Sequence, residues 1–299
     1  MVSNAERARA IRTATLQAVR QRNALADTAI QQLIGDYEDA ADAIGEHIQN
    51  AAGADDRVSL EHLQQVLSDV RQRLQELERR RDGRIYHALE EGAAAGVRPF
   101  AGILPSSQLF AVNHQAVAFV RGLTEADGLQ LSDRLWRLQR GAVETLTDHI
   151  QFAVINGESA HQAMMRSMGR GDGVPDDIAR AFQSASAGEL RRQVRSLMTG
   201  AADPVNGKGV VYQAERVFRT EINRAHGEAY MGAAFETDGA KGVRFMLSPN
   251  HRRRDVCDLH ASADLYGLGA GVYPTREACP WPAHPNTLSY VEVVFGSES

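Results

Sequence analysis

The first 95 residues carry an apolar pattern that restricts them to long helices. From Leu60 to Leu77, leucines and one valine recur at alternating steps of three and four residues, which is the spacing along one face of an α-helix. The preceding stretch, 3–52, contains no proline and has apolar residues near the same spacing, interrupted by Asn23. Because only the short segment AAGADDR separates the two stretches, we expect an antiparallel hairpin of two long helices.

The apolar stripe of this hairpin can be covered in two ways. It can pack against other helices of the same chain, as in a helical bundle. It can instead pack against a second chain in an intermolecular coiled coil, which would make the protein a homo-oligomer through its N-terminal helices. The pattern leaves both alternatives open.

The whole chain is predicted to be mainly α-helical, in three segments. Residues 1–95 form the long helical hairpin, 96–208 a central helical domain that begins with the linker GVRPFAGILPSS, and 209–299 a small C-terminal α+β module. The expected helices of the last two segments include 108–121, 130–156, a short helix at 159–169 and a long helix at 210–238, and the expected strands are 242–247 and 288–295.

Composition and charge exclude several classes of protein. A formal net charge of −5 argues against a general polyanion binder. The chain has no run of eighteen apolar residues, and its N-terminus, MVSNAERARAIRTA, lacks an apolar signal segment, so we expect neither a membrane span nor secretion. Two cysteines in 299 residues do not make a disulfide framework. We therefore expect folding in a reducing, cytoplasmic compartment.

Both cysteines lie in the loop between the two expected strands. Two residues separate Cys257 from His260, and four separate Cys279 from His284, with a glycine-rich stretch between the pairs. This arrangement resembles a closed tetrahedral zinc site, in which four protein ligands leave no open position and the metal is structural. A zinc ion would offset the cost of ordering a long loop with little apolar content. The alternative is two free thiols and two ordinary histidines in a loop packed by Trp281.

Two groups of charged residues are candidates for interaction. On the predicted helix 210–238, Glu221, Arg224 and Glu228 stand at helical spacing and Arg219 lies on another flank, which suits either a salt-bridged helix edge or a docking surface. The cluster HRRR at 251–254 can contact phosphates or an acidic partner, or lie in a solvated loop. The interaction candidates are therefore Arg219, Glu221, Arg224, Arg252, Arg253 and Arg254.

Three blocks of sequence, taken in order, resemble the phage Mu F-like minor head proteins, also called phage head morphogenesis proteins. The first is the helical stretch 122–168. The second is RVFRTEINRAHGEAYMGAAFE at 216–236, with its Arg-Thr-Glu triplet. The third joins RRDVCDLHASADLYGLGAGVYP to PWPAHPNTLSYVEVVF, where an Asp-x-Cys motif precedes a glycine loop and Pro-x-His-Pro leads into the last strand. The resemblance covers about residues 105–296 and leaves out the N-terminal hairpin.

The chain departs from the family's terminal signature at two positions. Many members of the family have two cysteines after the His-Pro pair, where this chain has Thr287 and Ser289. The resemblance suggests that Cys279 supplies a missing thiolate and that His260 replaces the second cysteine of a Cys-x-x-Cys pair. The positions that match the family are Asp255, Cys257, His284 and Pro285, with Arg219, Thr220 and Glu221 in the preceding helix.

The resemblance implies a structural protein of the virion head and not an enzyme. Its partners would be the portal protein, the major capsid protein and phage DNA, and it would act in head assembly, DNA packaging or ejection, after a stage in the host cytoplasm. One alternative is an ADP-ribosyltransferase-like enzyme, in which Arg219 and Glu221 line a nicotinamide pocket, although the companion Ser-Thr-Ser strand and Glu-x-Glu turn are missing. Another is a zinc-dependent DNA-binding module that uses the arginines at 252–254.

Overall fold

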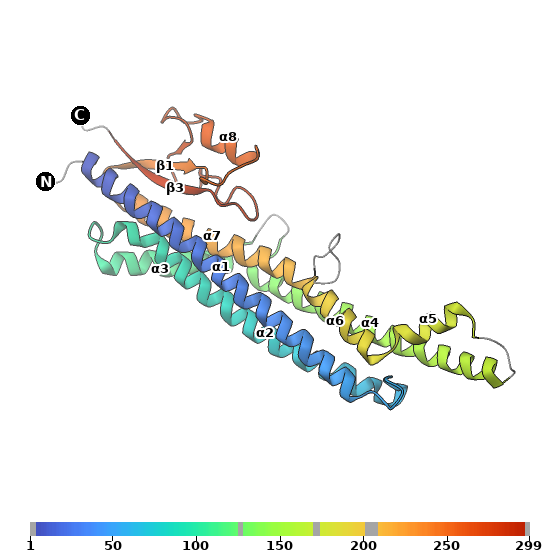
Figure 1. Cartoon of the computed structure of the whole chain (residues 1–299). Coiled ribbons are helices and arrows are strands. Elements are labelled where there is room, and N and C mark those ends of the chain that lie inside the picture. Colours follow the sequence, from blue (N-terminus) through green and yellow to red (C-terminus); the bar gives the residue numbers. More distant parts are fainter. Residues whose placement is uncertain (1–3, 125–127, 170–173, 201–208, 297–299) are drawn as a thin grey trace. The chain divides into compact units, whose positions relative to one another are not determined.

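The fold is described by a computed structural model that covers residues 4–124, 128–169, 174–200 and 209–296. Over these residues the chain is mainly helical, with eight α-helices and a small C-terminal sheet (Figure 1). The predicted fold class, mainly α with a small C-terminal α+β module, is confirmed. The helices are α1 Asn4–Asn50, α2 Leu60–Val97, α3 Ser106–Gly122, α4 Leu131–Gly169, α5 Asp176–Ser184, α6 Ala187–Thr199, α7 Val210–Phe235 and α8 Val256–Ser262, with a 3-10 turn η1 at Arg98–Phe100; the strands are β1 Ala240–Met246, β2 Val272–Tyr273 and β3 Tyr290–Phe295.

The chain divides into two compact units, each built from separate stretches of sequence. The first unit comprises Met1–Gln31, Gly83–Ser132 and Glu215–Ser299, and the second comprises Gln32–Asp82 and Asp133–Ala214. The three predicted segments are continuous in sequence, whereas α1 and α2 each contribute residues to both units. The candidate site lies entirely in the first unit.

In the second unit, α1 and α2 form the predicted antiparallel hairpin. Arg80 of α2 lies 3.7 Å from Asp36 of α1, and Arg73 contacts His47, so residues late in one helix face residues early in the other. The α2 stripe is buried inside the chain, which matches the first of the two packing alternatives. Its buried members are Leu63, Leu67, Val70, Leu74 and Leu77, whereas Leu60 remains 48% exposed.

Helix α4 is longer than the sequence predicted. We expected a break after residue 156 and a new short helix at 159–169, but α4 continues without interruption to Gly169. The reason is tertiary packing at Gly157, where an added Cβ would lie 2.2 Å from the Cβ of Ala185. Glycine weakens an isolated helix, but here its missing side chain lets the segment between α5 and α6 pack closely against α4.

The C-terminal sheet has the strand order β2-β1-β3, and both pairs are antiparallel. Val243 pairs with Val293 and Phe245 with Val291, which places apolar side chains of both strands on one face. Val243, Phe245 and Val291 are buried. The two predicted strands are confirmed, whereas α8 and β2, which lie in the connection between them, were not predicted.

Helix α7 is the central element of the first unit. Its face of small residues, predicted to admit a close neighbour, packs against the last turns of α2. A Cβ at Gly96 would lie 2.3 Å from the backbone oxygen of His226 and 3.1 Å from the Cβ of Ala229. The close approach of these two helices therefore requires glycine at position 96.

Among the described residues, no helix combines the length and the apolar composition that crossing a bilayer requires.

Two glycine substitutions in α2 should change the stability of the first unit in opposite directions. Gly96→Ala should lower the free energy of unfolding by about 1–3 kcal/mol, because the new methyl group overlaps α7. Gly83→Ala should raise it by about 0.5–1 kcal/mol, because an added Cβ meets no atom within 4 Å and alanine favours the helix.

Urea unfolding followed by the fluorescence of Trp281 measures both effects. The chain has two tryptophans, and the other, Trp136, belongs to the second unit, so a Trp136→Phe background makes the signal specific to the first unit. A Gly96→Ala protein as stable as its parent would contradict the close packing of α2 and α7.

Candidate metal centre

The first turn of α8 brings two of the candidate residues into fixed positions. Asp255 caps the helix: its Oδ1 accepts a hydrogen bond from the backbone N–H of Cys257 at 2.7 Å. In return, Asp258 Oδ2 accepts from the backbone N–H of Asp255 at 2.9 Å. This reciprocal capping box ties the carboxylate of Asp255 and the thiol of Cys257 to the same helix end.

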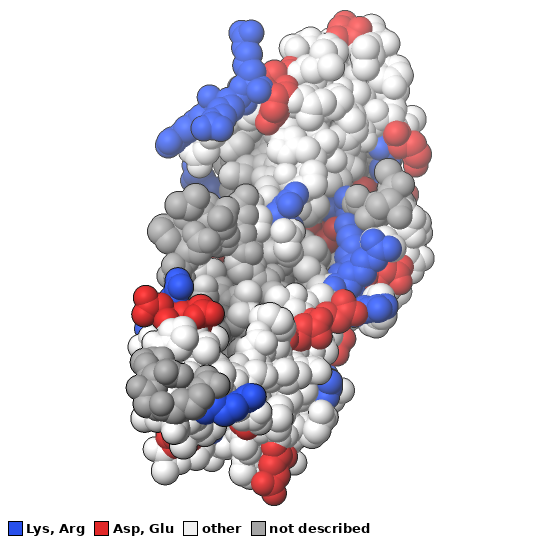
Figure 2. All heavy atoms as spheres, turned by 90° about the vertical axis from the view of Figure 1, so that its right-hand side faces the viewer, with Lys and Arg blue, Asp and Glu red and all other residues white. Residues whose placement is uncertain are grey.

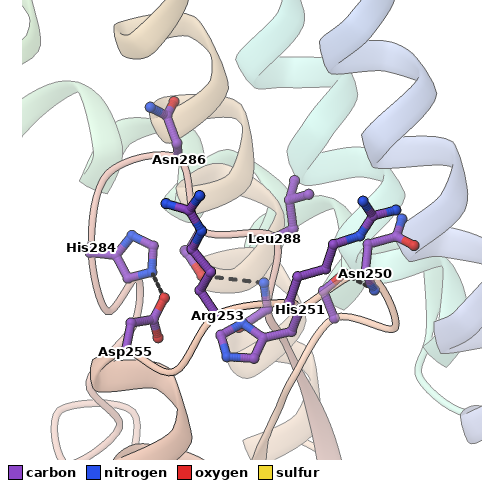
Figure 3. A pocket seen from close by; sticks show the side chains of 11 residues that line it. Asn250, His251, Arg253, Asp255, His284, Asn286 and Leu288 are labelled. Carbon is purple, nitrogen blue, oxygen red and sulfur yellow. Dashed lines mark hydrogen bonds and ion pairs between the residues drawn. The ribbon is translucent and has the colours of Figure 1, made fainter.

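His284 completes a cluster of three potential metal ligands. One ligand atom from each of Asp255, Cys257 and His284 lies within 4.8 Å of the others. His284 Nε2 lies 3.3 Å from Asp255 Oδ2, and Figure 3 shows the two side chains pointing toward each other. A second group, His251, Asp255 and Asp258, shares Asp255 with the first. Carboxylate oxygen, thiolate sulfur and imidazole nitrogen are all zinc ligands, so these residues can hold a metal ion.

The structure brings together only two of the four ligands predicted from the sequence. Cys257 and His284 belong to the cluster, whereas His260 and Cys279 belong to neither group. The ring of His260 packs against Phe245, with centroids 5.7 Å apart. The third member is Asp255, which the sequence analysis placed in the Asp-x-Cys motif without assigning it to the metal.

Cys279 lies apart from both groups of potential ligands. Its side chain is buried, and burial, assisted by the negative charge of Glu228, raises the pKa of the thiol to about 12. Among the described residues, Cys279 belongs to no group of three potential ligands, so the geometry gives it no metal partners. Burial also raises the pKa of Cys257, but hydrogen bonds from Thr287 and Ser289 to its sulfur act in the opposite direction.

A pocket of about 290 Å³ adjoins the cluster (Figure 3). It lies between the segment that precedes α8 and the segment that precedes β3. Asp255 and His284 stand on its wall together with the exposed Arg252 and Arg253. A metal held by the cluster would therefore border a pocket with a basic rim. The pocket is lined by Ser248, Asn250, His251, Arg252, Arg253, Asp255, His284, Asn286, Thr287, Leu288 and Ser289.

The segment 286–289, which forms the far wall of the cluster, is anchored to α7. The backbone N–H of Asn286 donates to Thr220 Oγ1 at 3.2 Å, and Asn223 Nδ2 donates to the carbonyl of Thr287 at 2.9 Å. The Thr287 hydroxyl in turn lies 3.5 Å from the sulfur of Cys257. The polar side chains of α7 thus reach the candidate centre through two hydrogen bonds.

A second anchor of the same segment is Arg22 of α1, which is 1% exposed. Its guanidinium donates to the carbonyls of Leu288 and Ser289, both at 3.3 Å, and to the side chains of Asn23 and Asn223. Burial lowers its pKa to about 10, so the side chain remains charged at neutral pH. The sequence analysis missed Arg22, and the only visible signal was the polar break at the neighbouring Asn23 in an otherwise apolar stripe.

The charged residues of α7, for which the sequence allowed either a salt-bridged helix edge or a docking surface, lie mostly inside the first unit. Glu221 is fully buried, and both oxygens of its carboxylate accept hydrogen bonds from Arg224 Nη1, at 2.8 and 2.7 Å. These two residues therefore offer no surface to a partner. Arg219 is partly exposed and pairs with Asp27 of α1 at 3.1 Å. Of the six interaction candidates, Arg252, Arg253 and Arg254 are exposed.

The distribution of charge does not form a single basic field on the face drawn in Figure 2. Basic and acidic side chains are both present there, with uncharged surface between them. A nucleic-acid footprint is usually a continuous stripe or patch of lysine and arginine. The three adjacent arginines, Arg252 to Arg254, are too few to make such a footprint by themselves.

No family model, curated protein or solved structure matches the chain.

The buried His226, which stacks on Tyr230 of the same helix, should make folding stability depend on pH. Burial, and secondarily the charge of Arg22, holds its pKa well below the ordinary value of 6.5. Below about pH 6.5 the unfolded chain therefore binds a proton that the folded chain does not, and stability falls as the pH is lowered. The contribution of this residue to the slope is at most about 1.4 kcal/mol per pH unit.

The test compares the pH dependence of unfolding in His226→Gln with that of the parent between neutral pH and pH 5. The variant should show a shallower loss of stability on acidification, whatever its stability at neutral pH. His87→Gln, which changes an exposed histidine of α2 in the same unit, should leave the dependence as in the parent. Equal slopes for the parent and His226→Gln would contradict the assignment of a neutral, buried imidazole.

Proposed function

We propose that this protein is a minor head protein of a tailed phage or prophage. It acts in head morphogenesis as a structural protein that bridges the portal protein and the major capsid protein, with a role in DNA packaging or ejection. Its place is the virion head, after assembly in the host cytoplasm. The proposal starts from the three sequence blocks that resemble the phage Mu F-like family.

The observation that carries the proposal is the meeting of two of those blocks around one centre. Thr220, in the Arg-Thr-Glu triplet, accepts a hydrogen bond from Asn286, which follows the His-Pro pair. His284 of that pair contacts Asp255 of the Asp-x-Cys motif. Thr220 and Asn286 are 66 residues apart in sequence and Asp255 and His284 are 29 residues apart, yet the members of each pair lie in contact. A shared structural core explains why such residues would recur together.

The roles of these residues favour a structural protein over an enzyme. Glu221 is fully buried and bound by Arg224, so its carboxylate does not face a substrate. Thr220 and Asn223 hold the backbone of the segment before β3. Polar groups that satisfy one another in this way fix the position of a loop, which is a structural role. The ADP-ribosyltransferase-like alternative requires Glu221 to line a nicotinamide pocket, and the buried position of this carboxylate argues against that role.

Exposed apolar side chains on the helices favour protein partners. Phe110 of α3 is 72% exposed, and Phe152 of α4 is 70% exposed. Phe152 shares a face of α4 with Ile155, which is 43% exposed, and adjoining exposed apolar side chains commonly mark surfaces that other proteins cover. This is the property expected of a protein that is built into a larger assembly.

We further propose that Asp255, Cys257 and His284 bind one zinc ion with a structural role. The donor set is suitable, because it offers oxygen, sulfur and nitrogen from three side chains within bonding range of one ion. When bound, the metal would link the start of α8 to the segment before β3. Three protein ligands leave one position that the chain does not fill from this cluster, unlike the closed four-ligand site predicted from the sequence.

Metal analysis of purified variants separates the two ligand sets. The parent should bind one equivalent of zinc, and Cys257→Ser and His284→Ala should each lose most of it, with a lower unfolding temperature of the first unit. His260→Ala and Cys279→Ala are the matched controls and should retain the zinc. Loss of zinc in the two control variants would support the four-ligand site predicted from the sequence. A parent protein that binds no zinc would refute the proposal of a metal centre.

Association with a portal protein tests the functional proposal. The gene neighbourhood should contain a portal gene and a major capsid gene, and the chain should co-purify with particles assembled from these proteins. A map of the particle should place the chain at the portal or the inner capsid wall. A neighbourhood without these genes, or particles that assemble with the chain left free in solution, would refute the proposal.

A further inference from the structure

The C-terminal module exposes a concentrated apolar surface on α8 and the loop that follows it. Five large apolar side chains in thirteen consecutive residues are exposed, with Leu259 at 62% and Leu265 at 66%. Val256 and Leu259 stand three residues apart and so share one face of α8. We call this surface the α8 patch; it consists of Val256, Leu259, Leu265, Tyr266 and Leu268.

The elements beneath the patch hold it in a defined position. Cys257, the buried residue of α8, faces the candidate centre, and the backbone N–H of Gly271 donates to the carbonyl of Ala263 at 2.8 Å. Tyr273 of β2 donates to the carbonyl of His260 at 3.0 Å and contacts the ring of Tyr266. The apolar side chains are therefore presented by an ordered helix and loop joined to the sheet.

The charges beside the patch differ at its two ends. Arg254 directly precedes the capped first turn of α8, and Asp264 follows the last turn; both are exposed. The carboxylates of Asp255 and Asp258, which lie between them, are occupied by the capping box and by His284 and His251. Asp264 uses Oδ1 to accept from the backbone N–H of Gly269, which leaves Oδ2 able to accept from a guanidinium. The order along the segment is thus basic, apolar and acidic.

This order makes the patch complementary to itself. In an interface with two-fold symmetry the same surface is used by both copies, and residue i of one copy meets residue j of the other in both directions. Arg254 lies just before α8 and Asp264 just after it. Antiparallel packing of two α8 helices would therefore bring the Arg254 end of each copy beside the Asp264 end of the other and cover apolar side chains of both.

We propose that the α8 patch is a homodimer interface, in which α8 of one copy packs antiparallel against α8 of a second copy. The buried apolar side chains supply the attraction, and the reciprocal Arg254–Asp264 pairs set the orientation. This inference does not depend on a virion role or on a bound metal. It also differs from the coiled coil of N-terminal helices considered from the sequence, because it places the contact at the opposite end of the chain.

A lipid surface is the other kind of partner for an apolar patch with nearby arginines. Attraction to an anionic membrane depends on an excess of positive charge, with about 1 kcal/mol for each basic residue near the surface. Residues 252–264 contain three arginines and three aspartates, so the segment has no net positive charge apart from histidine. Opposite charges at separate positions suit a protein surface with matching charges better than a uniformly anionic one.

Sedimentation of the full-length protein over a range of concentrations tests the proposal. We expect a monomer–dimer equilibrium that weakens at high salt. Leu259→Asp should give a monomer, because a carboxylate would replace the most exposed apolar side chain of α8 in the buried contact, and Leu265→Asp should weaken the dimer. Phe110→Asp, a matched change at an exposed apolar residue of α3 in the same unit, should leave the dimer intact. Circular dichroism should show unchanged helix content in all three variants.

A charge exchange tests the orientation. Arg254→Asp and Asp264→Arg should each weaken the dimer, and the double variant should restore it, because the symmetric pair is then re-formed with its signs reversed. A protein that stays monomeric at every concentration, or a dimer that survives both leucine substitutions, would overturn the proposal. Co-flotation of a monomeric parent with phosphatidylglycerol vesicles, lost in Leu259→Asp, would assign the patch to lipid instead.

Discussion

The arrangement of the first unit depends on one buried cation, the guanidinium of Arg22. Moving a charge out of water is costly unless hydrogen bonds replace its hydration, and among the described residues no carboxylate pairs with this one. Its acceptors come instead from Asn23 of α1, Asn223 of α7 and the carbonyls of Leu288 and Ser289. Because these groups belong to three distant stretches of sequence, satisfying one side chain holds two helices and the start of β3 together.

The candidate metal centre follows from that anchoring. The segment held by Arg22 and Asn223 carries Thr287 beside the sulfur of Cys257, and His284 just before it reaches Asp255. The connection between β1 and β3 buries Val272, Tyr273 and Trp281, and polar contacts with α7 and the capping box of α8 fix the segments that carry the centre. A metal at this point would add a link between segments that the hydrogen bonds already bring together.

Local patterns predicted the helices well and their limits less well. The steps of three and four residues from Leu63 to Leu77 identified the buried face of α2, because residues at this spacing lie on one side of a helix. The break expected after residue 156 was wrong, since a glycine that weakens an isolated helix is the residue that lets Ala185 pack against α4. The short α8 and β2 escaped prediction, because seven and two residues are too few to show a period.

The sequence by itself determined the mainly helical class, the antiparallel hairpin, the two longer C-terminal strands and the concentration of metal-binding residue types between them. Only the tertiary structure decided which of those residues meet: Asp255 joins Cys257 and His284, whereas His260 packs on Phe245 and Cys279 is buried near Glu228. It also turned Glu221 and Arg224 from surface candidates into a buried ion pair. The physical reason is that periodicity reports neighbours within one element, while a ligand set and a buried charge depend on contacts between elements far apart in the chain.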